Sequence, residues 1–92
     1  MYNFRTEFPD FDPATMPAIP FEWKDTSWCN DTCPSFAAQE NITVFVDYED
    51  INLREMQDDY PRFHIQSYDA EGNAISELIT DDWDKILDYF KA

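Results

Sequence analysis

The spacing of apolar positions changes in the last third of the chain. Over residues 62–68, Phe63 and Ile65 alternate with polar residues, which is typical of a strand with one buried face. Gly72, the only glycine in the protein, follows within a run of small and polar residues and indicates a tight hairpin turn. We therefore predict a second strand over residues 74–79 that returns antiparallel to the first.

Beyond this hairpin the apolar spacing becomes helical. Trp83, Ile86, Leu87 and Phe90 lie at positions i, i+3, i+4 and i+7, which form one face of an α-helix. The Thr-Asp-Asp sequence of residues 80–82 starts this helix, and its two aspartates favour the positive end of the helix dipole. We predict a C-terminal helix that packs on one face of the sheet.

Residues 41–48 give the clearest strand in the middle of the chain. Ile42, Val44 and Val46 fall on one face of it, whereas Phe45 falls on the other. Three weaker predictions complete this region: a first strand over residues 21–28, a short helix that Pro34 opens and that runs through Ala38, and a single helical turn within residues 50–59.

Four of the six prolines lie in residues 1–20, at a spacing that excludes a long helix or a central strand. The same segment carries four aromatic residues, Tyr2, Phe4, Phe8 and Phe11. We interpret it as an extended arm whose rings pack on its own domain, and docking of the arm on another chain is the alternative. Because the C-terminal helix covers one face, we expect the arm to cover Phe45, Tyr68 and Leu78 on the other.

Together these patterns predict one small α+β domain. Its sheet is antiparallel with three to four strands, one C-terminal helix packs on one face, and an extended N-terminal arm precedes it. We place the arm at residues 1–20 and the α+β domain at residues 21–92.

The charge balance restricts the choice of partner. Twenty acidic residues oppose six basic ones, which gives a formal net charge of -14. Such a surface repels nucleic acid and anionic membranes, so we expect direct binding to neither, and a cationic protein is the expected partner. No apolar run reaches the length of a membrane span and no apolar signal segment follows the first residues, so we expect a cytoplasmic location in a host cell.

Candidate reactive groups are few. Cys29 and Cys33 lie four residues apart and His64 is the only histidine, which falls short of a typical set of zinc ligands, so we expect no metal and no cofactor. A hydrogen-bonded strand histidine is a better interpretation of His64 than a general base, because no nucleophile pattern accompanies it. The residues around Gly72 do not meet the calcium-loop pattern. With no catalytic motif in the chain, we expect no enzymatic activity.

The acidic residues are the remaining candidates for function. Thirteen of them lie between residues 47 and 88. We predict five as partner-binding residues, on the central strand and on the polar side of the C-terminal helix: Asp47, Glu49, Asp81, Asp84 and Asp88. Carboxylates at this density can pair with the lysines and arginines that otherwise hold phosphates. A solvated acidic surface that keeps the protein soluble is the alternative.

Two segments resemble phage-encoded proteins: residues 27–36, Ser-Trp-Cys-Asn-Asp-Thr-Cys-Pro-Ser-Phe, and residues 61–64, Pro-Arg-Phe-His. With its small size, its dense acids among aromatics and its strand-and-helix layout, the chain is similar to small acidic phage proteins that disarm host defences, such as anti-CRISPR proteins and DNA mimics. The resemblance implies a stoichiometric inhibitor that occupies a cationic nucleic-acid-binding surface, with a CRISPR effector as the first choice of target. Alternatives are an immunity protein or antitoxin against a basic nuclease, and a small phage structural or assembly protein that uses the arm.

Overall fold

The computed structural model of the chain describes residues 3–54 and 61–91. Its main element is a five-stranded sheet in which each strand pairs antiparallel with the next one along the chain. The strands are β1 (Lys24–Asp25), β2 (Ser35–Gln39), β3 (Ile42–Val46), β4 (Phe63–Tyr68) and β5 (Ala74–Thr80). The α+β class and the antiparallel sheet are confirmed, with one strand more than the largest number predicted.

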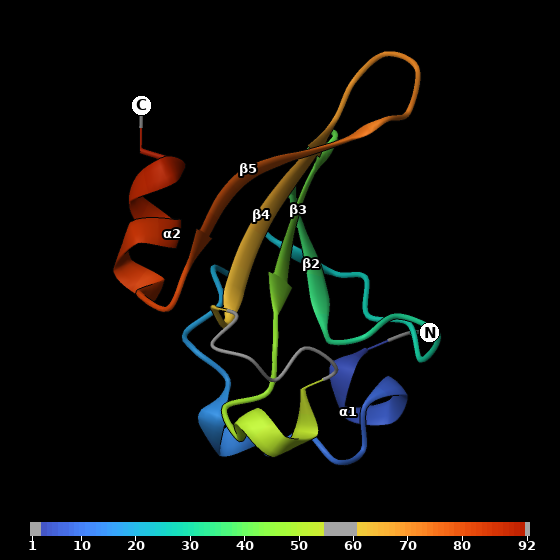
Figure 1. Cartoon of the computed structure of the whole chain (residues 1–92), viewed down its shortest axis with the longest axis vertical. Helices are drawn as coiled ribbons and strands as arrows, with labels where there is room; N and C mark the ends of the chain where they lie inside the picture. The colour runs from blue at the N-terminus through green and yellow to red at the C-terminus, as the bar shows by residue number, and fades with distance from the viewer. Residues whose placement is uncertain (1–2, 55–60, 92) are drawn as a thin grey trace.

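The hairpin of β4 and β5 forms as predicted, and its turn projects beyond the rest of the sheet (Figure 1). Asp69 holds the turn, because its Oδ1 accepts hydrogen bonds from the backbone N–H groups of Glu71 at 2.9 Å and Asn73 at 2.8 Å. Gly72 has a φ of 82°, a left-handed conformation that a Cβ atom disfavours. The hydrogen bond from the Asn73 backbone is the main cause that lowers the pKa of the Asp69 carboxyl group.

The C-terminal helix α2 (Trp83–Tyr89) packs on one face of the sheet, as predicted. Asp82 is its N-cap, and the side-chain Oδ1 accepts a hydrogen bond of 3.0 Å from the backbone N–H two residues later. Ile86 is fully buried against the sheet, and Trp83 and Phe90 are partly buried beside it. Among the described residues, no helix has the length and the apolar character needed to cross a membrane.

The central strand β3 confirms the strand predicted over residues 41–48. Val44 and Val46 are fully buried on one face, and Phe45 points to the other. A 3-10 helix, η2 (Ile51–Leu53), follows it and accounts for part of the helical turn predicted within residues 50–59. Residues 55–59 of that prediction lie outside the described residues.

Residues 34–38 extend into β2, so the short helix predicted from Pro34 is wrong. β2 pairs with β3, and Phe36 lies opposite Val44 with both side chains buried. The prediction used the preference of proline for the first turn of a helix. Pairing with the sheet and burial of Phe36 outweigh that local preference.

The first strand predicted over residues 21–28 is much shorter than expected, since β1 has two residues. A turn precedes it, in which the backbone N–H of Trp23 donates to the carbonyl oxygen of Pro20 at 3.0 Å. Asp25 ends it, because its Oδ1 accepts a 2.9 Å hydrogen bond from the backbone N–H two residues later. Phe21 lies in the turn and is 98% exposed, so the loose alternation of apolar residues does not mark a buried face here.

The extended arm predicted over residues 1–20 is not confirmed, because the described part of this segment, residues 3–20, contains helical turns. These are the helix α1 (Phe4–Glu7) and the 3-10 helix η1 (Pro13–Thr15). The prolines exclude a long helix but leave room for these single turns, and one of them begins η1, where its missing N–H has no cost. Phe8 and Phe11 are 6% and 3% exposed, so their rings belong to the core of the domain.

One hydrophobic core lies on a single face of the sheet, and α2 and the N-terminal segment both contribute to it. Its buried members are Phe8, Phe11, Phe36, Val44, Val46, Phe63, Ile65 and Ile86. The expectation that the N-terminal segment covers the second face is therefore wrong, and Phe45 and Tyr68 remain partly exposed there. Leu78 packs against the core instead, because a bulge at Glu77 places it opposite Ile65.

Replacing Phe11 by Ala should lower the free energy of unfolding by about 3–5 kcal/mol, because truncation of a buried aromatic ring leaves a cavity. Urea denaturation would measure the loss. The control is Phe21→Ala, the same replacement at a side chain that is 98% exposed, with an expected change below about 0.5 kcal/mol. Equal losses in the two variants would show that the N-terminal segment does not stabilise the sheet.

Candidate functional site

The five predicted partner-binding carboxylates fall into two groups in the structure. Asp47 and Glu49 follow β3, whereas Asp81 precedes α2 and Asp84 and Asp88 belong to it. Asp47 is partly buried, and the side chains of the other four are exposed. The five residues therefore do not line one continuous strand-and-helix edge, and each group has to be judged by its surroundings.

Arg62, immediately before β4, links the two groups. Its backbone N–H donates a hydrogen bond of 2.8 Å to Oδ1 of Asp81. Its side-chain Nε donates to the carbonyl oxygen of Asp47 at 2.9 Å, and a terminal guanidinium nitrogen donates to the carbonyl oxygen of Thr15 at 2.8 Å. The guanidinium group also lies over the ring of Phe63, 5.1 Å from its centroid. One side chain thus fastens the N-terminal segment to the ends of β3 and β4.

This junction compensates part of the negative charge of the first group. Burial lowers the pKa of Arg62, while the carboxylates of Glu49 and Asp47 act in the opposite direction. In the second group only Asp81 contacts Arg62, and Asp88 instead forms an exposed salt bridge of 3.2 Å with Lys91. The structure therefore brings three of the five predicted residues near Arg62 and leaves the two acids of α2 on the outside.

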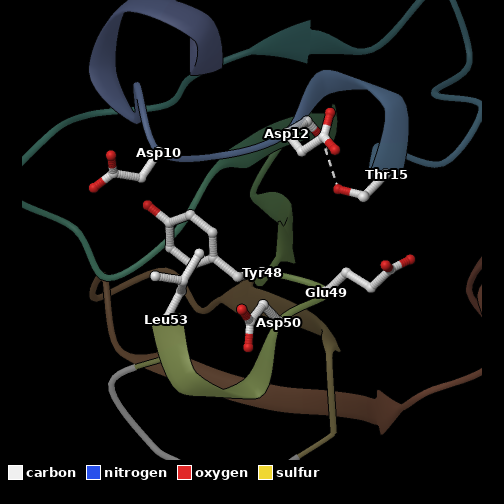
Figure 2. Close-up of a pocket in the computed structure, with 7 residues that line it drawn as sticks. All are labelled: Asp10, Asp12, Thr15, Tyr48, Glu49, Asp50 and Leu53. Atoms are coloured by element: carbon white, nitrogen blue, oxygen red, sulfur yellow. Dashed lines mark hydrogen bonds between the residues drawn. The ribbon is translucent and has the colours of Figure 1, made fainter.

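A cleft beside the first group gathers more carboxylates than the sequence analysis predicted (Figure 2). Its volume is about 240 Å³, and its lining residues are Asp10, Asp12, Thr15, Tyr48, Glu49, Asp50 and Leu53. They come from two segments, residues 10–15 and 48–53, which are distant in sequence and face each other across the cleft. We call this feature the acidic cleft.

Two of its carboxylates are fixed because each caps a 3-10 helix. Oδ1 of Asp12 accepts a hydrogen bond of 3.0 Å from the backbone N–H of Ala14 in η1, and Oδ1 of Asp50 accepts one of 2.9 Å from Asn52 in η2. The hydroxyl group of Thr15 also donates to the backbone carbonyl oxygen of Asp12 at 2.7 Å (Figure 2). Local turn chemistry thus holds one carboxylate on each side of the cleft.

The other two carboxylates, of Asp10 and Glu49, accept no hydrogen bond from any residue that the structure describes. The hydroxyl group of Tyr48 is directed toward Asp10 (Figure 2). Burial raises the pKa of Tyr48, and the negative charge of Asp10 adds to this effect, so the phenol stays neutral at physiological pH. Asp10 and Glu49 are therefore the acids of the cleft with the most freedom to meet an external group.

The floor of the acidic cleft is apolar. The ring of Tyr48 packs on the core, with its centroid 5.3 Å from that of Phe11 and 6.5 Å from that of Phe8. Leu53, which lies beside Tyr48 in Figure 2, is 47% exposed and also lines the cleft. An apolar floor with an acidic rim matches the side chain of lysine or arginine, whose aliphatic stem can lie on the floor while its charged end meets the carboxylates.

The structure shows the surroundings of the other candidate reactive groups, which are the metal-ligating side chains, the two cysteines and His64. Across residues 3–54 and 61–91, no three His, Cys, Asp or Glu side chains are grouped in a way that could hold a metal ion. Cys29 is exposed and Cys33 is buried, and both are free thiols. Burial, with a contribution from Asp47, raises the pKa of Cys33 to about 12, so its thiol is unreactive. Nε2 of His64 lies 2.9 Å from Oγ of Ser76, which confirms a hydrogen-bonded strand histidine.

Many acids outside the acidic cleft have local structural roles. The following five each accept a hydrogen bond from a backbone N–H group: Glu7, Asp25, Asp69, Asp81 and Asp82. Such bonds hold loops and a helix start in place, and they give these residues a reason to be acidic that is independent of any partner. Net charge alone therefore does not tell which carboxylates are available for binding.

Sequence reasoning missed Asp10, Asp12 and Asp50 as members of the site. Asp is a preferred cap residue and Asp12 directly precedes a proline, so the caps at Asp12 and Asp50 could have been predicted. The proximity of the two segments depends on burial of Phe8 and Phe11 on the sheet, which no spacing along the chain indicates.

Comparison with models of known protein families, with curated proteins and with solved structures gives no match for this chain. The resemblance to small acidic phage proteins therefore stays a prediction.

Replacing Arg62 by Lys should lower the free energy of unfolding by about 1–3 kcal/mol, because an ammonium group cannot reproduce both guanidinium hydrogen bonds. Arg5→Lys, at an exposed arginine, is the matched control, and its expected change is below about 0.5 kcal/mol. Thermal unfolding of both variants measures the difference. An unchanged stability of the Arg62 variant would show that this junction does not hold the segments together.

The pH dependence of stability should report on His64. Burial lowers its pKa from the ordinary value of 6.5, so the unfolded chain takes up a proton at a higher pH than the folded chain does. The contribution of His64 to stability is therefore complete above pH 6.5 and is lost as the pH falls toward the folded-state pKa. Urea unfolding of wild type and His64→Gln from about pH 8 to about pH 5 separates this effect from the carboxylates. A constant difference between the two proteins across this range would contradict the assignment.

Proposed function

We propose that this protein is a stoichiometric binding protein that presents carboxylates to a cationic surface of another protein and competes there with nucleic acid. The acidic cleft is the observation that carries the proposal. Four carboxylates from two distant segments surround its apolar floor, and no basic side chain is among its lining residues. Lysines and arginines that normally contact phosphates are the chemical complement of such a site.

The charge of the whole molecule supports this proposal. Duplex DNA carries one charge per ~1.7 Å of axis, so fourteen charges correspond to ~24 Å of duplex. The protein carries a formal charge of -14, and its longest dimension is 33 Å. Its charge per unit length is thus of the same order as that of DNA, and a groove built for a phosphate backbone would attract it. Since exposed ion pairs each contribute little, tight binding requires several of them at once.

The proposal ranks the acidic residues by their freedom to bind. Asp10 and Glu49 make the main contacts in the cleft, and the capping carboxylates of Asp12 and Asp50 add to the field at its rim. Asp84 and Asp88 would make secondary contacts from the exposed side of α2. Asp47 and Asp81, which we also predicted as partner-binding residues, mainly hold the junction at Arg62 in this view.

A nucleic-acid-binding defence complex of a host cell is the target we propose, with a CRISPR effector as the first candidate. The protein would act in the cytoplasm by occupying the site, with no catalysis and no cofactor. An immunity protein against a basic nuclease would use the same cleft on a different partner. Assembly through an aromatic arm loses its support, because Phe8 and Phe11 are buried in the protein's own core.

Charge reversal in the acidic cleft should weaken binding to the target. The immobilised protein would capture a target from bacterial lysate at low salt, and the purified target would then be titrated with variants. We expect Asp10→Lys/Glu49→Lys to weaken binding by about tenfold or more, because it removes the free carboxylates of the cleft. Nucleic acid should compete with the wild type, and the affinity should fall steeply as salt is raised.

The matched control is Glu22→Lys/Glu40→Lys, which changes the net charge by the same amount at two exposed residues outside the cleft. We expect it to weaken binding by less than about threefold, through the long-range field alone. Equal effects of the two double variants would remove the cleft from the proposal. A target that nucleic acid does not displace would remove the mimicry of phosphates.

A further inference from the structure

The outer edge of β5 is open to a further strand. β5 has seven residues, and it pairs with β4 on one side and with no strand among the described residues on the other. α2 follows β5 in the chain but packs on the core face of the sheet through Ile86. The backbone N–H and C=O groups along such an edge can pair with an extended segment of another protein.

Two exposed isoleucines add apolar surface to this edge. Ile75 is 45% exposed and Ile79 is 37% exposed. Their partners on β4 are Ser67 and His64, which belong to opposite faces of the sheet. A strand added along β5 would therefore find an apolar contact on each face, in addition to its backbone hydrogen bonds.

The usual protection of an edge strand is weak here. Lysine side chains and bulges commonly guard such edges, and β5 has a bulge at Glu77 but no lysine. The carboxylate of Glu77 accepts hydrogen bonds from the hydroxyl groups of Ser67 at 2.7 Å and Tyr89 at 3.3 Å. These bonds draw the side chain back over the sheet and α2, so Glu77 does not extend away from the edge.

Charge selects the occupant of this edge. Residues 65–84, which include all of β5 and both of its flanks, contain six acids and no basic residue: Asp69, Glu71, Glu77, Asp81, Asp82 and Asp84. A second copy of this chain, paired edge to edge, would bring these acids against one another. A segment rich in lysine or arginine would instead be attracted along the whole length of the strand.

We infer that the β5 edge binds an extended basic segment of the partner protein as an additional antiparallel or parallel strand. The inference deepens the proposed function, on which it rests, since it names the form in which part of the cationic partner is recognised. The acidic cleft and the β5 edge then act as two separate contacts, one for individual cationic side chains and one for a length of backbone. Binding through both would raise the overall affinity beyond that of either contact.

The test uses the full chain and a synthetic peptide, Lys-Lys-Val-Thr-Val-Thr-Val-Lys-Lys, in a titration followed by two-dimensional amide NMR. We expect the peptide to shift the amide signals of residues 74–80 and to slow their hydrogen exchange. Ile79→Lys should weaken peptide binding by about tenfold, because it places a like charge and a long side chain at the edge. Phe21→Lys is the control, since it places the same charge at an exposed apolar residue outside both β5 and the acidic cleft, and it should weaken binding by less than about twofold.

Three outcomes would overturn the inference. The peptide could fail to bind, it could shift residues 10–15 and 48–53 of the acidic cleft instead of β5, or the two lysine variants could weaken binding equally. A fourth such outcome would come from analytical ultracentrifugation. A dimer that Ile79→Lys abolishes would show that the β5 edge binds a second copy of this chain. If the peptide does not bind but nucleic acid still competes with the protein for its target, the edge contact alone is refuted. If the peptide binds at β5 but nucleic acid does not compete, the proposed function is refuted and the edge contact stands.

Discussion

One apolar face of the sheet has to be covered by segments from both ends of the chain. α2 is seven residues long and buries Ile86, which leaves the rest of the face to Phe8 and Phe11 of the N-terminal segment. That burial brings residues 10–15 against residues 48–53, and the acidic cleft is the outer side of the same contact. Residues 8–15 thus contribute both to the core and to the candidate site.

The parts of the fold that could be predicted from the sequence are those that depend on neighbouring residues. The β4–β5 hairpin follows from a two-residue period and Gly72, and α2 follows from a helical period that starts after Asp81 and Asp82. The predictions of a short helix from Pro34 and of an extended arm fail because contacts with distant strands place Phe36 and Phe11. Glu49 of the cleft was predicted from charge, but its proximity to Asp10 depends on those same distant contacts.

The acidic residues of this protein serve two purposes that composition does not separate. Some accept backbone hydrogen bonds, as Asp82 does at the start of α2 and Asp69 does in the hairpin turn. Others, such as Asp10 and Glu49, have no such partner among the described residues and face the cleft. Self-repulsion of a chain with a net charge of -14 opposes folding, and the first group offsets part of that cost through the turns it stabilises. Asp10 and Glu49 stabilise no turn in this way.

The two cysteines differ so much in accessibility that the protein carries a single addressable thiol. Cys29 is exposed, whereas Cys33 is buried and its pKa is raised to about 12. A maleimide reagent at neutral pH therefore attaches to Cys29 and leaves the interior intact. The backbone N–H of Cys29 also donates a hydrogen bond of 3.2 Å to Oε1 of Glu7, the last residue of α1. A fluorophore on Cys29 would lie close to the end of α1 and would sense any detachment of the N-terminal segment from the sheet.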